Sequence, residues 1–409
     1  MNYYKRENYL SQIRGFYYDT SIIKVITGVR RCGKSSLMHI VAEELTESGV
    51  NSENIIFIDL DKRGYKNIKK PEQLEEIIEK LSTATGVKYL FIDEVQNVKD
   101  FEEVLNAYRL EEDYSIFITG SNSYLLSGEL VTKLTGRYVE FEMLPLTFEE
   151  YLGMKEFLKK PIEDLTTELD KYIHEGGFPQ ALTYDNIEDK RKYVASVVQE
   201  IFDKDIKKRV TIRNVSGFQK VQQYLINNFG ATTSISNLLD ELHKIGIRIK
   251  RDTLVRYIEI LKDSKILYEC KRFDLKSKKS IGGEQKYYLS DLGFWFVMNT
   301  DNRINYGPIL ENVVYNYALS KRYSISIGRI GKLECDFILR DNTMNYSYIQ
   351  VAMTILNDIK TEDREYTPLE MIKDNYPKYV MTRNDMLQQR NGIKHVNIPS
   401  FMKDGLMFD

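Results

Sequence analysis

The chain has 409 residues, of which 58 are lysine or arginine and 60 are aspartate or glutamate, and its formal net charge is −2. Hydrophobic residues make up 42% and charged residues 29%, which allows ordinary buried cores and excludes a wholly disordered protein. Three widely spaced cysteines exclude a disulfide scaffold. No apolar run approaches the roughly 20 residues of a membrane helix. We therefore expect a soluble, cytoplasmic protein of two or three domains without membrane contact.

The near-neutral total conceals an uneven distribution of charge. Residues 1–150 hold 18 basic and 25 acidic side chains, a net charge of −7. Residues 186–290 hold 22 and 13, a net charge of +9. The basic middle segment is the best indication in the composition of a polyanionic partner.

Between residues 22 and 142, short β-branched and aromatic runs alternate with helical patterns. This alternation predicts an α/β fold in which helices cover both faces of a mostly parallel sheet. The expected strands are 22–27, 55–60, 89–92, 115–119 and 138–141. The expected helices are 34–48, 71–82, 101–110 and 122–134.

The first expected strand leads into the run Gly28-Val29-Arg30-Arg31-Cys32-Gly33-Lys34-Ser35. This run matches the phosphate-loop pattern G-x-x-x-x-G-K-[ST], with the strand before it and the helix after it that the pattern requires. Backbone N–H groups of the loop would surround a phosphate, Lys34 would reach the β- and γ-phosphates, and Ser35 would ligate magnesium. The residues predicted to contact the nucleotide are Gly28, Arg30, Arg31, Cys32, Gly33, Lys34, Ser35 and Ser36.

A second motif, Tyr89-Leu90-Phe91-Ile92-Asp93-Glu94, is an apolar strand that ends in two carboxylates. Asp93 would hold the hydrated magnesium ion. Glu94 would orient and deprotonate the attacking water, so the pair favours hydrolysis over binding alone.

Two further polar positions fit a hydrolytic site. After the expected strand 115–119, Asn122 or Ser121 would contact the γ-phosphate or the water. Arg137 would act across a subunit boundary on the phosphate of a neighbouring molecule. The alternatives are a helix cap for Asn122 and a surface cation at a strand edge for Arg137.

Five segments carry a resemblance to a known family, and they occur in the order GVRRCGKSS, YLFIDEVQ, FITGSNS, LTGRYVEFEMLPLTFEEYL and EGGFPQAL. In them the chain resembles the prokaryotic AAA+ ATPases whose C-terminal half is the domain of unknown function 4143. The resemblance implies ATP and Mg²⁺ as ligands, Asn122 as the first sensor and Arg137 as the arginine finger. It also implies a small helical lid over Pro145–Leu182 and leaves open a homo-oligomer formed through the AAA+ domain.

The basic segment predicts a winged helix, with helices at 217–229, 236–245 and 251–264 and strand-like runs at 266–272 and 286–289. Residues 244–279 alone contain 12 basic and 5 acidic side chains, and Arg251, Arg256 and Lys262 are expected to be exposed. Such a helix would enter the major groove of double-stranded DNA, with phosphate contacts from the hairpin. The expected DNA contacts are Lys250, Arg251, Thr253, Arg256, Lys276, Lys278 and Lys279. The alternative is a winged helix that only packs between domains.

From residue 308 onward the order of elements resembles the restriction-endonuclease-like fold. The order is helix 308–322, strands 324–330, 333–339 and 346–353, helix 361–376 and strand 378–382. The metal-binding positions of that fold correspond to Glu311, Asp336 and Gln350. Because Gln350 replaces a carboxylate and Ala352 replaces the lysine that would activate water, we expect a degenerate domain without nuclease activity.

The chain is thus predicted to contain four parts. They are an AAA+ P-loop ATPase core (1–144), a helical lid and connector (145–205), a winged-helix domain (206–290) and a degenerate restriction-endonuclease-like domain (291–409). The predicted function is ATP hydrolysis coupled to DNA binding through the winged helix. Two alternatives stay open: a nucleotide-dependent protein-interaction switch without DNA contact, and a metal-dependent nuclease.

Overall fold

The computed structural model describes residues 3–120, 134, 136–207, 212, 214–277, 279–299, 305–356 and 358–409, without the side chains of 279–281. The chain forms two compact units, Met1–Met143 and Leu144–Asp409, and each is described by itself. Among the described residues, no helix has the length and apolar character needed to cross a membrane.

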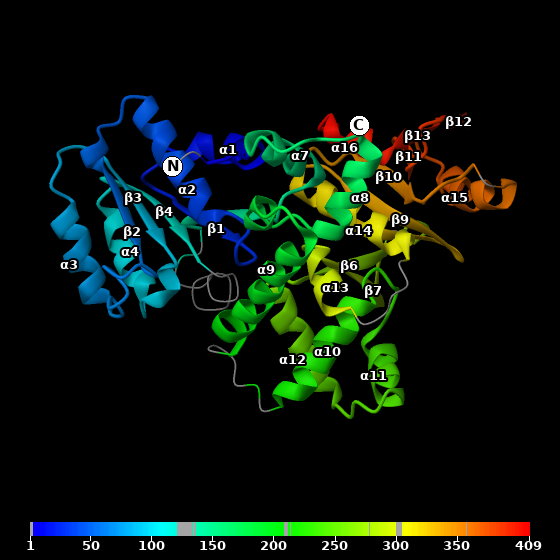
Figure 1. The fold of residues 1–409 in the computed structure, drawn as a ribbon, viewed down its shortest axis with the longest axis horizontal. Helices are drawn as coiled ribbons and strands as arrows, with labels where there is room; N and C mark the ends of the chain where they lie inside the picture. The colour runs from blue at the N-terminus through cyan, green and yellow to red at the C-terminus, as the bar shows by residue number, and fades with distance from the viewer. Residues whose placement is uncertain are drawn as a thin grey trace. The chain divides into compact units, whose positions relative to one another are not determined.

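The first unit is built on a five-stranded sheet in which every neighbouring pair of strands is parallel (Figure 1). The strand order is β2-β3-β4-β1-β5, so β4 lies between β1 and β3. The strands are β1 (Ile23–Gly28), β2 (Ile55–Asp59), β3 (Lys88–Asp93), β4 (Tyr114–Thr119) and β5 (Tyr138–Met143). The predicted α/β fold with a parallel five-stranded sheet is confirmed.

Helices cover both faces of this sheet. They are α1 (Glu7–Ile13), α2 (Lys34–Glu47), α3 (Pro71–Leu81) and α4 (Phe101–Leu110). On one face, Val25, Ile58, Ile92 and Ile118 from alternate strand positions form a core with apolar residues of α3 and α4. On the other face, His39 of α2 stacks on Phe57 with ring centroids 4.1 Å apart. The helix expected at 122–134 lies outside the described residues, apart from Leu134.

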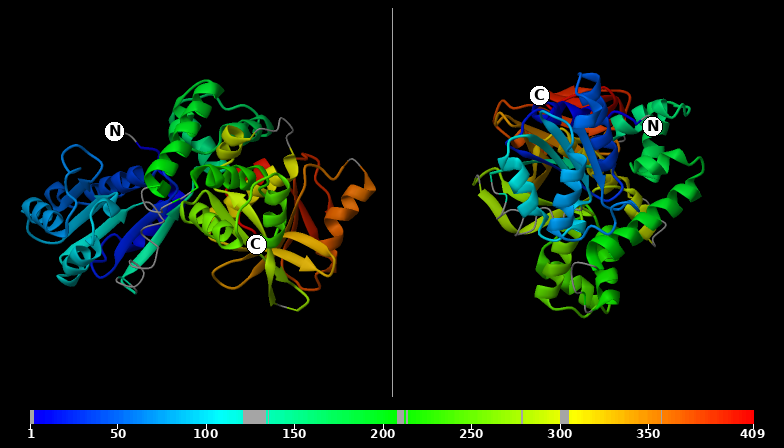
Figure 2. Two further views of the ribbon diagram at one scale, coloured as in Figure 1. Left: turned by 90° about the horizontal axis from the view of Figure 1, so that it is seen from below. Right: turned by 90° about the vertical axis from the view of Figure 1, so that its left-hand side faces the viewer.

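The second unit begins with a helical region. Its helices are α7 (Phe148–Phe157), α8 (Leu165–Glu175) and α9 (Ile187–Glu200), followed by a π-helix at Ile201–Lys207. The next three helices are α10 (Val215–Asn227), α11 (Ile235–Lys244) and α12 (Arg251–Asp263), close to the ranges expected for a winged helix. These three form one group of green ribbons in Figure 1 and again in the right-hand view of Figure 2.

A single eight-stranded sheet occupies the rest of the second unit, in the order β12-β13-β11-β10-β9-β8-β6-β7. Its strands are β6 (Leu267–Asp274), β7 (Lys279–Leu289), β8 (Ser324–Ile330), β9 (Leu333–Arg340), β10 (Tyr346–Val351), β11 (Lys378–Thr382), β12 (Gln389–Arg390) and β13 (Ile393–Asn397). The accompanying helices are α13 (Gly293–Met298), α14 (Tyr306–Ser320), α15 (Ile359–Met371) and α16 (Ile398–Lys403). The hairpin expected as the wing is β6–β7, and β6 pairs in parallel with β8, so one sheet runs through the segments 206–290 and 291–409.

The EGGFPQAL segment surrounds a buried carboxylate. Asp291 accepts hydrogen bonds from the backbone N–H groups of Gly177 (2.6 Å) and Gly293 (2.7 Å). A Cβ atom on Gly176 would lie 2.2 Å from the Asp291 Oδ1 atom, so this position requires glycine. Burial raises the pKa of Asp291 to about 7, although the two N–H donors oppose that shift.

The stability of the second unit is predicted to depend on the protonation of Asp291. Because the pKa is higher in the folded protein than in the unfolded chain, this contribution is fully present below about pH 4 and is lost as the pH rises through about 7. We expect thermal unfolding to show a loss of about 2–4 kcal/mol across that window. Asp291→Asn, which cannot titrate, should be less stable at pH 4 and should lack most of this slope. An unchanged slope would exclude Asp291 as its source.

Candidate functional site

The strand order brings the two predicted nucleotide motifs to the same edge of the first sheet. The phosphate loop follows β1 and Asp93 ends β3, and the carboxyl ends of parallel strands lie together. Thr119, at the end of the intervening strand β4, lies between the two motifs. The parallel register aligns Ile26 of β1 with Thr119, and Ile118 of β4 with Ile92 of β3.

The phosphate loop has a backbone conformation that its glycines permit. Gly28 has φ 140° and Gly33 has φ 112°, values that residues with a side chain rarely adopt. A Cβ atom on Gly28 would also lie 2.2 Å from the carbonyl oxygen of Met143 on β5. The buried amine of Lys34 donates hydrogen bonds to the carbonyl oxygens of Gly28 (3.0 Å) and Val29 (3.2 Å). The lysine side chain therefore folds back over the loop.

The carboxyl pair at the end of β3 is joined to β4 by one hydroxyl group. Thr119 Oγ1 donates a hydrogen bond to Asp93 and accepts one from the backbone N–H of Glu94 (3.1 Å). Glu94 itself has a left-handed backbone conformation, with φ 57° and ψ 44°. The chain therefore turns sharply after Asp93, and Thr119 forms hydrogen bonds with the residue before the turn and the residue within it.

Glu94 faces a cation that the phosphate loop supplies. Its Oε1 atom lies 3.8 Å from Nη1 of Arg30, and both side chains are largely buried. Burial raises the pKa of the Glu94 carboxyl above its ordinary value, while the charges of Arg30 and Lys34 oppose the shift. Gln96 also donates a hydrogen bond to Glu94. The two motifs are thus in direct electrostatic contact.

The hydrogen-bond donors and acceptors at this edge fit a nucleoside triphosphate with magnesium. The loop combines permissive glycines with a lysine, and Asp93 is a buried carboxylate beside it. No cluster of three or more histidine, cysteine, aspartate or glutamate side chains suited to a metal occurs within the described ranges. Magnesium in phosphate-loop proteins needs no such cluster, because one hydroxyl, one carboxylate, phosphates and water complete its shell.

The remaining two predicted ATPase residues differ in what can be said of them. Asn122 and its alternative, Ser121, lie outside the described residues. Arg137 immediately precedes β5, so it lies at the amino edge of the parallel sheet, opposite the phosphate loop. There its Nη1 atom donates a hydrogen bond to Asn106 (3.2 Å).

Two contacts of the nucleotide site were missed from the sequence. Thr119 was visible only as a polar residue at the end of an apolar strand. Arg6 donates a hydrogen bond to the carbonyl oxygen of Cys32 in the loop (3.0 Å), and it is only 4% exposed. No local pattern marked Arg6, because a contact across 26 residues depends on the tertiary fold.

The residues expected to contact DNA are divided between two sides of α12. Lys250, Thr253 and Arg256 line one groove, whereas Arg251 lines a different pocket and donates a hydrogen bond to Ser236 (3.1 Å). Lys276 is exposed. Lys278 lies outside the described residues, as does the side chain of Lys279.

The expected exposure of Lys262 was wrong. Its side chain is only 25% exposed and forms ion pairs with Glu259 (2.9 Å) and Glu269 (2.6 Å). Helical periodicity places Lys262 off the apolar stripe of α12, but the hairpin strand β6 packs there and supplies Glu269.

The three residues predicted as degenerate nuclease positions, Glu311, Asp336 and Gln350, line one cavity of about 660 Å³. A lysine from the hairpin neutralises this cluster: Lys286 donates hydrogen bonds to Glu311 (2.9 Å) and Glu334 (2.9 Å). Burial opposes the charge on Lys286, but Glu311, Asp336 and Glu334 together raise its pKa. Burial and the nearby charge of Glu311 raise the pKa of Asp336. The carboxylates therefore already have a cationic partner.

Comparisons with known proteins identify two regions and several relatives. Residues 20–152 match the AAA domain family, and residues 166–302 match a domain of unknown function, DUF8612. The matched domain thus differs from number 4143, which the sequence motifs had suggested.

An uncharacterized protein of Haemophilus influenzae is 33% identical over 380 residues, 92% of each chain. Uncharacterized protein MJ1544 of Methanocaldococcus jannaschii is 32% identical over 89% of this chain and 82% of that protein. Among solved structures, the Walker-type ATPase PABY2304 of Pyrococcus abyssi matches 72% of this chain and 96% of that chain, with 16% identity and a TM-score of 0.49.

Replacement of Thr119 by valine tests the hydroxyl that joins β3 and β4. The change leaves Asp93 and the N–H of Glu94 without a buried partner, which should lower the free energy of unfolding by about 2 kcal/mol. Thermal unfolding measures the loss, and Thr119→Ser, which retains the hydroxyl, should unfold close to the wild type. Equal destabilisation by both variants would show that the methyl group matters instead.

Replacement of Lys286 by methionine should leave Glu311 without its buried cation, while Glu334 keeps only its ion pair with Arg272. We expect a loss of about 3–5 kcal/mol of stability at neutral pH, with partial recovery at pH 4 as the carboxyl groups take up protons. Lys332→Met is the matched control, because Lys332 lines the same cavity but is exposed. Equal effects of the two variants in urea unfolding would contradict a specific role of Lys286.

Proposed function

Since the chain belongs to the family of these uncharacterized bacterial and archaeal proteins and carries an AAA domain in a P-loop NTPase fold, we propose that it binds ATP with Mg²⁺ and hydrolyses it. The observation that carries this proposal is the contact between the two motifs. Glu94 lies 3.8 Å from Arg30 of the phosphate loop, and Thr119 bonds both Asp93 and Glu94.

Each residue at the edge of the sheet has a distinct task in this proposal. Backbone N–H groups from Gly28 to Ser36 bind phosphate oxygens, and Lys34 leaves its carbonyl partners to hold the β- and γ-phosphates. Ser35 and Asp93 would hold magnesium, which neutralises charge on the phosphates when it is bound. Glu94 orients the attacking water and accepts its proton, and the raised pKa of its carboxyl suits a general base.

Arg137 is placed so that it could contact the bound nucleotide of a neighbouring copy, but not that of its own chain. At the amino edge of its own sheet it cannot act on its own phosphate loop, whereas a neighbouring copy would offer the opposite edge. We therefore assign it to a homo-oligomer as the finger that stabilises charge on a neighbour's γ-phosphate. Asn122 keeps its proposed role as the sensor of the γ-phosphate or the water.

For the second unit, we propose that the nucleotide state is coupled to double-stranded DNA. The support is electrostatic: residues 186–290 carry a net charge of +9, and they include the three helices and the hairpin of a winged helix. A nuclease reaction is not part of the proposal, because Lys286 already neutralises the acidic cluster and alanine stands at position 352.

One observation favours the protein-interaction switch as a second candidate. Exposed apolar side chains lie on the two loops that follow β10 and β11 and at the start of α15, and they are Met353, Leu356, Ile359, Met386 and Leu387. Asn384 joins these loops through its bonds with the N–H of Ile355 (3.2 Å) and the hydroxyl of Thr354 (2.9 Å). A partner protein that covers this patch would bury apolar surface.

Two substitutions separate nucleotide binding from hydrolysis. Lys34→Ala should abolish binding of a fluorescent ATP analogue, because the charge facing the phosphates is removed. Glu94→Gln should retain binding but release phosphate about 100-fold more slowly or worse, because the amide cannot accept a proton. Glu111→Gln changes an exposed carboxyl on the same unit and should leave both unaffected. Normal turnover by Glu94→Gln would remove Glu94 from its proposed role.

A further inference from the structure

We propose that the phosphate backbone of duplex DNA binds in a groove between α10 and α12, and not on the side of α12 that faces the hairpin. This inference rests on the proposed contact between the second unit and DNA, and it gives that contact a location. The groove, called here the α10–α12 groove, is about 940 Å³ in volume. Its walls are the first two turns of α10, the first two turns of α12 and the turn before α12.

Four basic side chains line the α10–α12 groove without an internal partner. Lys220 comes from α10, Arg248 and Lys250 from the turn, and Arg256 from α12. All four are exposed, and within the described part of the chain none has an ion pair or a side-chain hydrogen bond. Asp252 is the single acidic residue among those that line the groove. Unpaired cations around one hollow attract an anion readily, because no internal ion pair has to break first.

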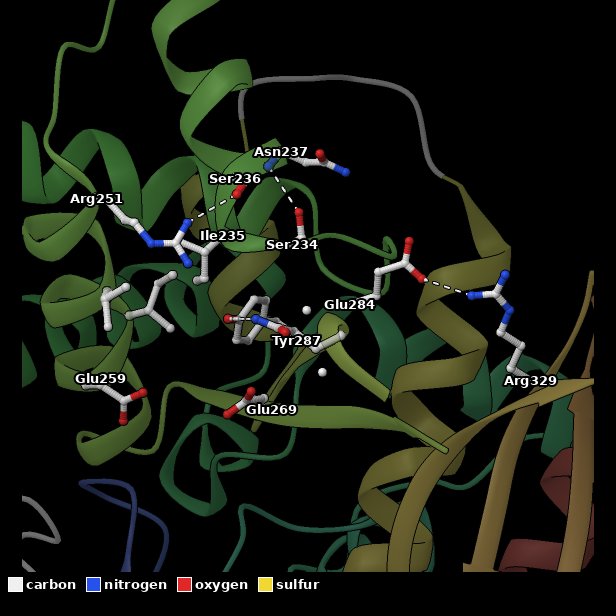
Figure 3. A pocket seen from close by; sticks show the side chains of 15 residues that line it. Ser234, Ile235, Ser236, Asn237, Arg251, Glu259, Glu269, Glu284, Tyr287 and Arg329 are labelled. Atoms are coloured by element: carbon white, nitrogen blue, oxygen red, sulfur yellow. Dashed lines mark hydrogen bonds and ion pairs between the residues drawn. The ribbon is translucent and has the colours of Figure 1, made fainter. Parts of the chain in front are cut away.

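The opposite side of α12 has a different charge balance. Figure 3 shows the pocket there, about 710 Å³ in volume, between α11, α12 and the hairpin. Its two arginines both have partners: Arg251 is bonded to Ser236 (3.1 Å), and Arg329 lies 3.9 Å from Glu284. Glu259 and Glu269 also line this pocket. The carboxylates are engaged as well, since Lys262 pairs with Glu259 and Glu269 and Arg272 pairs with Glu284. A phosphate chain would have to displace an internal partner to bind the arginines of this pocket.

The uncharged groups of the α10–α12 groove suit phosphate oxygens. Ser216 and Thr253 supply hydroxyl groups, and such side chains together with lysine and arginine make most backbone contacts to DNA. The N-terminus of α12 has no side-chain cap, so its first N–H groups add donors on the same wall. The groove therefore combines charge with directed hydrogen-bond donors.

The groove favours duplex over single-stranded nucleic acid. Proteins that bind unpaired strands stack bases on exposed aromatic rings. The aromatic residue of this groove, Tyr257, is only 5% exposed, and its hydroxyl donates a hydrogen bond to the carbonyl oxygen of Asn214 (3.2 Å). Without a stacking surface, the groove can recognise the phosphates but not the faces of the bases.

Binding of the full-length protein to a fluorescent 30-base-pair duplex of mixed sequence tests the groove. Anisotropy titrations at several NaCl concentrations between 50 and 200 mM give both the affinity and its salt dependence. The double variant Lys220→Glu with Arg256→Glu should bind at least tenfold more weakly. The slope of log affinity against log salt should become shallower by about 2, one unit for each phosphate that the variant no longer neutralises.

The matched control carries the same change of charge outside the α10–α12 groove. Arg251→Glu with Lys276→Glu alters one residue of α12 that lines the pocket of Figure 3 and one residue of the hairpin turn, and it should bind duplex within about twofold of the wild type. ATP turnover and circular dichroism, measured on both double variants, show that each is folded. Arg256→Lys, which keeps the charge, should bind like the wild type.

Three outcomes would overturn the inference, and they are distinguishable. If the control fails to bind while the groove variant binds normally, DNA binding stands but its site is the hairpin side. If the wild type binds single-stranded DNA of equal length more tightly than duplex, the duplex assignment is wrong. If the wild type binds no duplex at 50 mM NaCl, the proposed DNA contact itself fails, while ATP turnover remains a separate question.

Discussion

The parallel alignment of β1, β4 and β3 is the constraint on which the nucleotide site depends. Parallel strands place their carboxyl ends at one edge, so motifs separated by about 60 residues in the chain meet there. The hydroxyl of Thr119 then ties Asp93 and the backbone of Glu94 to the strand between the motifs. The loop, the carboxylates and the hydroxyl are thus parts of one arrangement, because a shift of β4 would disturb all of them.

Buried titratable groups organise the second unit in a comparable way. The carboxylate of Asp291 holds the backbone of Gly177 against that of Gly293, and Lys286 holds strand β7 against Glu311 of α14 and Glu334 of β9. A buried charge without a partner would cost several kcal/mol, so each of these groups restricts which segments can pack together. The cluster that resembles a nuclease centre therefore serves as an internal ion-pair network in this chain.

The basic segment shows why net charge and accessible charge must be distinguished. Many of its cations are neutralised locally, as Lys262 is by Glu259 and Glu269. A group of exposed cations without internal partners among the described residues lines one side of α12, where Lys220 and Arg248 accompany Arg256. Neither Lys220 nor Arg248 stood out in the sequence, because they become neighbours of Arg256 only when α10 packs against α12.

The sequence by itself determined the α/β class and the strands of the first unit, and it predicted a phosphate loop after the first strand. These features follow from local information: alternating periodicity, glycine spacing and a lysine at the start of a helix. The strand predicted at 324–330 begins and ends at the same residues in the structure. The short elements β12, β13 and α16 were missed, because so few residues carry little periodic signal.

Only the tertiary structure decided which polar residues act together. Strand order placed Thr119 beside Asp93 and put Arg137 at the far edge, and the pairing of β6 with β8 joined the hairpin to the C-terminal sheet. Side-chain partners decided that Arg251 is engaged and Arg256 free within the described chain. The physical reason is the same in each case: hydrogen bonds and ion pairs depend on distance in space, which local sequence patterns do not specify.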